Sequence, residues 1–150
     1  MRIIIQRVSE ASVRIEENVS AQIGPGLLIL LGIIETDTQE DIDWLVGKMT
    51  RMRIFADDEH KMNKCLGDID GELLVVSQFT LHAGTRKGNR PSFIKAARPE
   101  TAIPLYQAFL KTAQNVMGKA CASGEFGADM QVSLVNDGPV TIMLDSQLRE

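Results

Sequence analysis

Two hydroxyls and a carboxamide follow directly on an uninterrupted apolar run in the stretch Glu72–Leu81, ELLVVSQFTL. Leu73–Val76 is apolar at every position, which is typical of a strand covered on both faces in the middle of a sheet. Such a strand would deliver Ser77, Gln78 and Thr80 to its carboxyl end, and a two-residue period would put Gln78 and Thr80 on one face. The alternative is that the polar residues only mark where a strand leaves the core.

Two further segments could carry chemistry. Asn136-Asp137-Gly138-Pro139 joins an Asp-Gly pair, typical of a type I′ hairpin, to a proline that removes an amide donor and favours extended backbone at Gly138. We therefore expect an unusual turn, whose Gly-Pro bond can be cis. Arg86-Lys87-Gly88-Asn89-Arg90 places three cations directly after the predicted central strand, where they could contact a phosphate. The alternatives are a tight turn without function and a solvated surface loop.

Several known catalytic arrangements are missing from the sequence. It has no Ser-His-Asp spacing, nucleophile elbow or P-loop, and no paired carboxylates near these segments. His82 is the local candidate for a base, and on a continued strand it would share a face with Thr80 as base and nucleophile. The alternative is a histidine that is exposed to solvent or that only packs.

The composition is that of one ordinary globular domain, residues 1–150, with 44% hydrophobic and 24% charged residues. The net charge of -4 argues against general coating of nucleic acid but allows one local phosphate-binding patch. Cys65 and Cys121 lie far apart and have only two histidines to join them, so neither a disulfide scaffold nor a zinc site is indicated. The opening residues, MRIIIQRV, are too short and too interrupted for a signal sequence or a membrane span, and we expect a cytoplasmic protein.

Hydrophobic patterns supply the elements that must position these residues. Helical spacing predicts one helix after the cap candidates at Thr36–Thr38 and a second over about Glu100–Met117, where Pro104 either delays the start or bends the helix. Strands lead, helices intervene and strands close, which predicts an α/β layered domain with the helices on one side of the sheets. Leu27–Ile34 has no alternation either and is predicted to be a second strand buried on both faces. The other predicted strands are Arg2–Val8 and Ala11–Ile15, paired with each other, then Ser20–Ile23, a short strand at Arg53–Ala56, Met130–Asn136 and Val140–Asp145.

Six motifs give the chain a resemblance to a known family along essentially its whole length. They are IQRV at Ile5–Val8, RIF at Arg53–Phe55, KMN at Lys61–Asn63, SQFTL at Ser77–Leu81, RPSF at Arg90–Phe93 and FGADMQVSLVNDGPVT at Phe126–Thr141. With these motifs the chain resembles the D-aminoacyl-tRNA deacylases. The resemblance implies a single-domain layered β/β/α sandwich with mixed sheets and two main helices on one side. It also implies a cytoplasmic homodimer without metal or cofactor that cleaves the ester between a D-amino acid and the tRNA 3′-terminal adenosine, and that acts on glycyl-tRNA.

The resemblance also implies roles for individual residues. Gly138-Pro139 is similar to a cis Gly-Pro motif that enters the partner subunit's active site, where its carbonyls would crowd out an L side chain. Arg7 would steady that turn. The remaining implied residues are Ser77, Gln78, Phe79 and Thr80 in the catalytic pocket floor, Phe126 and Met130 as adenosine and substrate contacts, and Arg86, Lys87 and Arg90 as tRNA contacts.

The implied chemistry explains why no triad is needed. An activated ester requires a held carbonyl, an oxyanion donor and an oriented water, which the tRNA 2′-hydroxyl can assist. Backbone N–H groups near Phe79 and Thr80 are the expected oxyanion donors. Three alternatives remain open at this stage: Thr80 as a covalent nucleophile, a non-catalytic tRNA-binding module, and a purely structural dimer.

Overall fold

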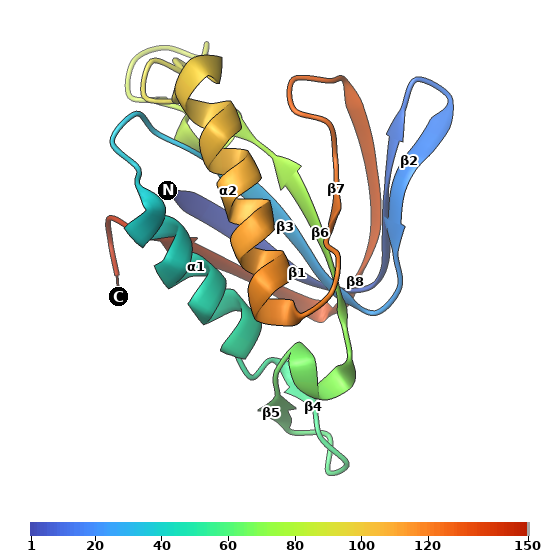
Figure 1. Ribbon diagram of the computed structural model, residues 1–150. Helices are drawn as coiled ribbons and strands as arrows, with labels where there is room; N and C mark the ends of the chain where they lie inside the picture. The colour runs from blue at the N-terminus through green and yellow to red at the C-terminus, as the bar shows by residue number, and fades with distance from the viewer. Residues whose placement is uncertain (150) are drawn as a thin grey trace.

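A six-stranded mixed sheet, two long helices and a separate two-stranded sheet form the part of the chain that the structure, a computed structural model, describes: residues 1–149 (Figure 1). The strand order is β2-β1-β3-β6-β7, with β8 also paired to β1. The elements are β1 (Arg2–Ile15), β2 (Asn18–Ile23), β3 (Gly26–Gly32), α1 (Gln39–Arg51), β4 (Phe55–Ala56), β5 (Met62–Lys64), a 3₁₀ turn (Gly67–Ile69), β6 (Glu72–Ser77), a second 3₁₀ turn (Phe79–His82), α2 (Pro99–Met117), β7 (Ala122–Ser123) and β8 (Met130–Asp145).

The long strand β1 folds the sheet into two layers. Its first half pairs with β3 and its second half with β2, while β8 follows its other edge from Arg2 to Ile15. The polar pair Ser9-Glu10 lies at the change of partner, beside irregularities in the β1·β8 register. The expectation of two strands paired with each other was therefore wrong, because one continuous strand spans both apolar runs.

The core has two parts, one on each face of the β3–β6 pair. Leu27, Ile29 and Leu31 of β3 face the helices and pack with residues such as Leu45 and Phe109. Leu28 of β3 and the β6 residues Leu74 and Val76 face the second layer, formed by parts of β1, β2 and β8. Figure 1 shows α1 and α2 side by side over one face of the sheet. The predicted α/β layering, with two helices on one side, is confirmed.

Both helices begin close to where the sequence predicts them. The N-cap of α1, Thr38, forms a capping box with Asp41, whose Oδ2 accepts the Thr38 N–H at 2.8 Å. Helix α2 has Pro99 at its first position, and Pro104 lies inside the helix instead of delaying its start. Proline at that point leaves the carbonyl one turn earlier without its helical donor.

Strand β6 is buried on both faces, as predicted, and lies between β3 and β7. The strand ends at Ser77, however, and Phe79–His82 turns into a short 3₁₀ helix. A two-residue period therefore does not extend past Ser77. The predicted shared faces of Gln78 with Thr80, and of Thr80 with His82, were wrong for this reason.

Strand β8 differs from its prediction as well. Met130–Asn136 and Val140–Asp145, predicted as two strands separated by an unusual turn, belong to one strand paired with β1. Gln6 pairs with Thr141 and Val8 with Asn136, so the residues between them on β8 outnumber those on β1. Asp137–Val140 therefore forms an outward bulge in a continuous ladder.

Candidate active site

The chain leaves β6 at Ser77 and turns into the 3₁₀ helix Phe79–His82. The Gln78 N–H donates to the Leu31 carbonyl at 2.7 Å, which extends the β3–β6 pairing by one residue. The Gln78 side-chain amide then donates to Thr80 Oγ1 at 2.6 Å across the 3₁₀ turn. Gly32 allows the turn to approach β3, since a Cβ there would lie 3.0 Å from Leu81 Cβ and from His82 Cδ2.

Two consecutive backbone N–H groups are unused at this turn. The first donors of any helical turn lack a partner within the helix. Within residues 1–149, neither Phe79 N–H nor Thr80 N–H has an acceptor, whereas Leu81 N–H and Ala83 N–H are both bonded. The turn therefore offers a pair of donors suited to a carbonyl oxygen or an oxyanion.

A pocket of about 280 Å³ lies beside this turn, between the carboxyl end of β6, the start of α2 and the loop before β8. Its volume is near the lower end of small-molecule sites, which run from ~300 to 1,000 Å³. The predicted residues Ser77, Gln78, Phe79, Phe126 and Met130 all line it, whereas Thr80 is not among the lining residues. The other lining residues are Leu31, Ile33, Val76, Ala97, Ala102, Gly127, Ala128 and Val132.

The pocket lining contains no ionisable side chain. Beside it, the Tyr106 hydroxyl donates to the Val75 carbonyl at 2.9 Å, and burial raises the pKa of Tyr106 to about 12. Tyr106 also packs on Phe126, with ring centroids 5.9 Å apart. Tyr106 therefore joins α2 to β6 and to a pocket wall as a neutral group.

His82 is buried beneath the turn, and its Nε2 has no hydrogen-bond partner among the described residues. Burial lowers the pKa of His82, so the neutral imidazole is favoured. Its side chain does not line the pocket, and Thr80 Oγ1 accepts a hydrogen bond from the Gln78 side-chain amide, not from His82. The structure therefore does not form the pairing of Thr80 with a His82 base.

The Asp137–Val140 bulge is held by side chains on both sides. Arg7 Nε donates to the Asp137 carbonyl at 2.9 Å, and Arg7 Nη1 donates to the Ile54 carbonyl at 2.5 Å. Asn136 Oδ1 accepts the Val140 N–H at 2.9 Å. Gly138 has a φ of +130° and precedes Pro139 through a cis peptide bond. Both residues are exposed, and neither lines the pocket of its own chain.

Comparison with known proteins identifies the family. Residues 4–145 match the family model described as D-Tyr-tRNA(Tyr) deacylase. The chain belongs to this family. D-aminoacyl-tRNA deacylases from Akkermansia muciniphila and Flavobacterium johnsoniae are 61% and 59% identical to it, each over 150 residues and the full length of both chains. The chain is accordingly a hydrolase of the deacylase kind.

Two solved structures share the fold. One, described as c-Myc DNA unwinding element binding protein, superposes with a TM-score of 0.90 at 40% identity, covering 97% of this chain and 98% of the other. A probable eukaryotic D-amino acid tRNA deacylase superposes with a TM-score of 0.82 at 18% identity, covering 95% and 97%. At that identity the second comparison shows the fold alone. The deacylase fold thus extends over nearly the whole chain.

The predicted cations lie away from the pocket lining of this deacylase-family chain. Arg86, Lys87 and Arg90 are exposed on the loop that follows the 3₁₀ turn.

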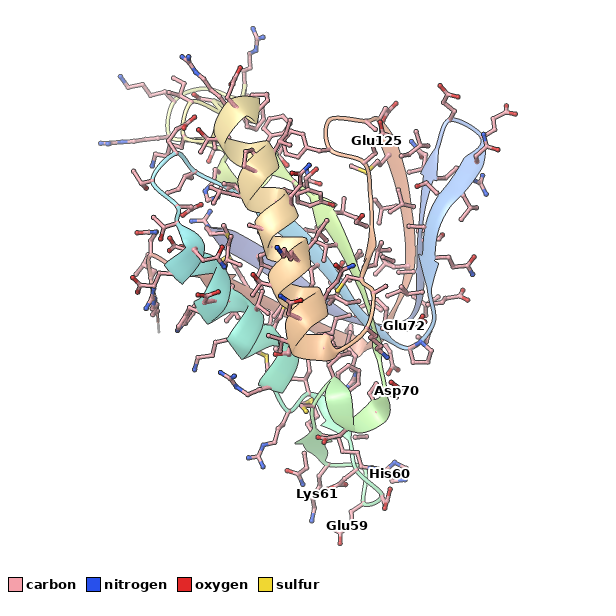
Figure 2. All side chains as sticks on the ribbon, viewed as in Figure 1. Glu59, His60, Lys61, Asp70, Glu72 and Glu125 are labelled. Atoms are coloured by element: carbon pink, nitrogen blue, oxygen red, sulfur yellow. The ribbon has the colours of Figure 1, made fainter. Side chains whose placement is uncertain are left out.

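No cluster of three or more possible metal ligands occurs within residues 1–149, and none of the helices there is long and apolar enough to cross a membrane. Figure 2 places Glu125 near the β6 tip and His60 at the opposite end, on the β4–β5 hairpin.

Sequence reasoning missed part of the pocket lining, and it missed a neighbour of Phe79 that lies outside the lining. Ala97 and Ala102 line the pocket, and Phe93 packs edge-on against Phe79 with ring centroids 5.0 Å apart. Ala102 belongs to the predicted second helix, but its direction toward the β6 tip depends on how that helix lies on the sheet. Phe93 belongs to the RPSF motif of the family resemblance, and this motif was the signal in the sequence that could have pointed to it.

Proposed function

We propose that this chain hydrolyses the ester that joins a D-amino acid to the 3′-terminal adenosine of tRNA, releasing the free D-amino acid and tRNA. The observation that carries the proposal is the pair of unused N–H groups of Phe79 and Thr80 beside a pocket at the carboxyl end of β6. The same pocket would accept glycine, including glycine mischarged on tRNA(Ala). The activity would proofread chirality during translation, in the cytoplasm, where aminoacyl-tRNA is used.

The proposed mechanism uses the backbone and the substrate. Attack of water on the ester carbonyl places negative charge on its oxygen, which the Phe79 and Thr80 N–H groups would stabilise. Because the pocket lining carries no ionisable side chain, the adjacent 2′-hydroxyl of the terminal ribose would help to orient the water. Collapse of the tetrahedral intermediate then expels the tRNA 3′-oxygen. We assign Phe126 and Met130 to contacts with the adenosine and the substrate, which their places in the pocket wall support.

Thr80 as a covalent nucleophile is the rival mechanism, and its hydrogen bonding argues against it. Thr80 Oγ1 accepts a bond from an amide, which does not activate a hydroxyl for attack. We expect Thr80→Ala to retain single-turnover cleavage within about tenfold, the cost of ~0.5–1.5 kcal/mol for one lost hydrogen bond. A loss of ~10⁴-fold or more that Thr80→Ser rescues would show that the hydroxyl attacks.

Chiral selection is proposed to come from Gly138-Pro139 of a partner subunit. The bulge is exposed, fixed by Arg7 and absent from the pocket of its own chain, so it is available to enter another. Strand β8 also exposes Val135 at 49% on one side of the bulge and Met143 at 59% on the other, and a second copy would cover both. In the proposed homodimer, the backbone of the turn would fill the space that an L side chain needs.

The function is tested by release of tyrosine from D-tyrosyl-tRNA and L-tyrosyl-tRNA, each with and without chelator. We expect cleavage of the D ester alone, unaffected by the chelator, because the proposed chemistry needs no metal. Equal cleavage of both esters would contradict chiral selection. Failure to cleave either ester while tRNA still binds would instead indicate a non-catalytic tRNA-binding module, and failure to bind tRNA would leave the structural dimer.

A further inference from the structure

The segment Gly84–Arg98 differs in charge from the rest of the chain. The chain as a whole has 20 acidic and 16 basic residues, but this segment contains no Asp or Glu. Its cations are Arg86, Lys87, Arg90, Lys95 and Arg98. None of them forms an ion pair within residues 1–149, whereas Lys61, Lys64 and Lys119 elsewhere do. The segment is therefore an unneutralised cationic surface, which favours a polyanion.

The cationic surface ends at the start of α2, where the Glu35 carboxylate lies beside Arg98. Glu35 accepts the Arg98 N–H at 2.6 Å and the Thr101 hydroxyl at 2.7 Å. The bond from the Arg98 N–H is the main reason that the pKa of Glu35 is lowered, which keeps a carboxylate beside Arg98. Arg86, Lys87, Arg90 and Lys95 are therefore the cations left for a phosphate.

Exposed apolar side chains connect this surface to the pocket. Phe79 lines the pocket and is 55% exposed, and Phe93, which packs against it, is 37% exposed. Ile94, next in sequence, is 91% exposed. Aromatic side chains beside unpaired cations are the composition of single-stranded nucleic-acid sites, where bases stack and phosphates pair.

The opposite rim of the pocket has the opposite charge. Glu125 and Asp129 are exposed on either side of Phe126 and Ala128, which line the pocket. In Figure 2 Glu125 lies on the loop between β7 and β8, and in Figure 1 the segment after β6 extends past the start of α2. A phosphate chain leaving the pocket would be repelled by one rim and attracted by the other.

We propose that Phe93 stacks a base of the single-stranded nucleotides preceding the terminal adenosine of tRNA, while Lys95 and the Arg86–Arg90 cations bind their phosphates. This inference rests on the proposed function and assigns a second RNA subsite outside the pocket. A pocket of about 280 Å³ is too small to hold more than one end of an aminoacyl-nucleotide chain. The upstream nucleotides must therefore lie on a rim, and the cationic rim is the one that attracts them.

The test compares two substrates that share the reacting ester: D-tyrosyl-tRNA, and D-tyrosyl-adenosine, which lacks the upstream nucleotides. We expect Phe93→Ala to raise KM for the tRNA by about 5- to 100-fold, the usual range for a lost base stack, with kcat unchanged. KM for the adenosine ester should stay within twofold. Phe93→Tyr, which keeps a stacking ring, should restore the tRNA value, and Val116→Ala, an exposed site on α2, is the matched control.

The role of the cations is tested by the dependence of kcat/KM on salt concentration. Lys95→Gln with Arg90→Gln should flatten the dependence of log(kcat/KM) on log salt by about 0.7 per lost phosphate contact for the tRNA, and leave the adenosine ester unchanged. Lys111→Gln, on α2, should change neither. Equal effects of the Phe93 variant on both substrates, or no effect on either, would overturn the subsite. Failure of the unaltered protein to cleave either substrate would overturn the proposed function itself.

Discussion

Phe79 contributes its backbone and its ring to different tasks. Its N–H is one of the two unused donors, and its ring lines the pocket and packs on Phe93. Phe79 is the first residue of the 3₁₀ turn, where the fixed φ of proline is tolerated. Replacement by proline can therefore remove the donor without removing the turn.

We predict that Phe79→Pro lowers kcat on D-tyrosyl-tRNA by about 10²- to 10³-fold relative to Phe79→Ala, because alanine lacks the ring but keeps the N–H. Single-turnover kinetics at saturating enzyme measure this difference. Equal rates for the two variants would mean that the Phe79 N–H does not contact the developing oxyanion.

Gly138 is constrained by its backbone and by its neighbour. Its φ is +130°, which L side chains rarely adopt, and a Cβ there would lie 2.5 Å from Arg7 Nη2. We predict that Gly138→Ala costs about 1–3 kcal/mol of stability and lowers the ratio of D to L cleavage by displacing the turn. Denaturant unfolding and paired D- and L-tyrosyl-tRNA assays check the two effects.

Gly118→Ala is the matched control for Gly138. It also has a positive φ, +68°, but no atom lies within 4 Å of the added Cβ, and it ends α2. It should lose stability and keep full chiral discrimination. If Gly138→Ala cleaved the D ester and rejected the L ester as the unaltered chain does, the turn would not be part of the site.

The 3₁₀ turn after β6 is fixed at the scale of elements. Arg2 Nη1 donates to the Leu81 carbonyl at 2.6 Å, and Arg2 also pairs with Asp145 at 2.8 Å, so β1 and the end of β8 hold the turn. His82 is buried beneath it. The donors at Phe79 and Thr80 are thus placed by contacts that begin far away in sequence.

Burial of His82 predicts acid sensitivity of this element. Burial lowers the pKa of His82 below its ordinary 6.5, and Arg2 opposes protonation while Asp37 favours it. The stabilisation from a neutral His82 is complete above pH 6.5 and is lost as the pH falls from there toward the lower folded pKa, because the unfolded chain binds the proton first. The free energy of unfolding should therefore decrease between pH 7 and pH 5.

His82→Gln should flatten this decrease relative to the unaltered chain. Urea unfolding at several pH values measures both slopes. A His82→Gln variant with the slope of the unaltered chain would show that another group causes the acid sensitivity.

Much of the fold could be predicted because the spacing of apolar residues indicates which face of a helix or strand is buried. The runs of β3 and β6 and the stripes of the two helices lie where the sequence places them. The continuity of β1 and β8 could not be predicted, since Ser9-Glu10 and Asn136–Pro139 read as breaks. In each case the β1·β8 ladder resumes on the far side of the segment, so the two apolar runs belong to one strand.

The candidate site was predictable in residue identity more than in geometry. Ser77, Gln78 and Phe79 line the pocket, as predicted. The 3₁₀ turn that leaves two N–H groups without partners could not be predicted, because its residues show no hydrophobic pattern that distinguishes a turn from a continued strand. Pattern also cannot show that Phe93 lies against Phe79, since that contact depends on the path of a polar loop.

At the scale of the molecule, the layers place the pocket and the bulge on different surfaces. The pocket lies at the carboxyl end of β6. The bulge interrupts the β1·β8 ladder and does not line the pocket. We propose that a complete site needs the pocket of one subunit and the Gly138-Pro139 turn of another.

Mixing two variants tests whether the turn acts on the pocket of the partner. Gly138→Ala has an intact pocket and an altered turn, whereas Phe79→Pro has an altered pocket and an intact turn. With increasing excess of Phe79→Pro during subunit exchange, we predict that L-tyrosyl-tRNA cleavage per Gly138→Ala subunit falls toward zero while D-tyrosyl-tRNA cleavage persists. Cleavage of the L ester that stays constant at every mixing ratio would contradict the claim, because the turn would then act on the pocket of its own chain.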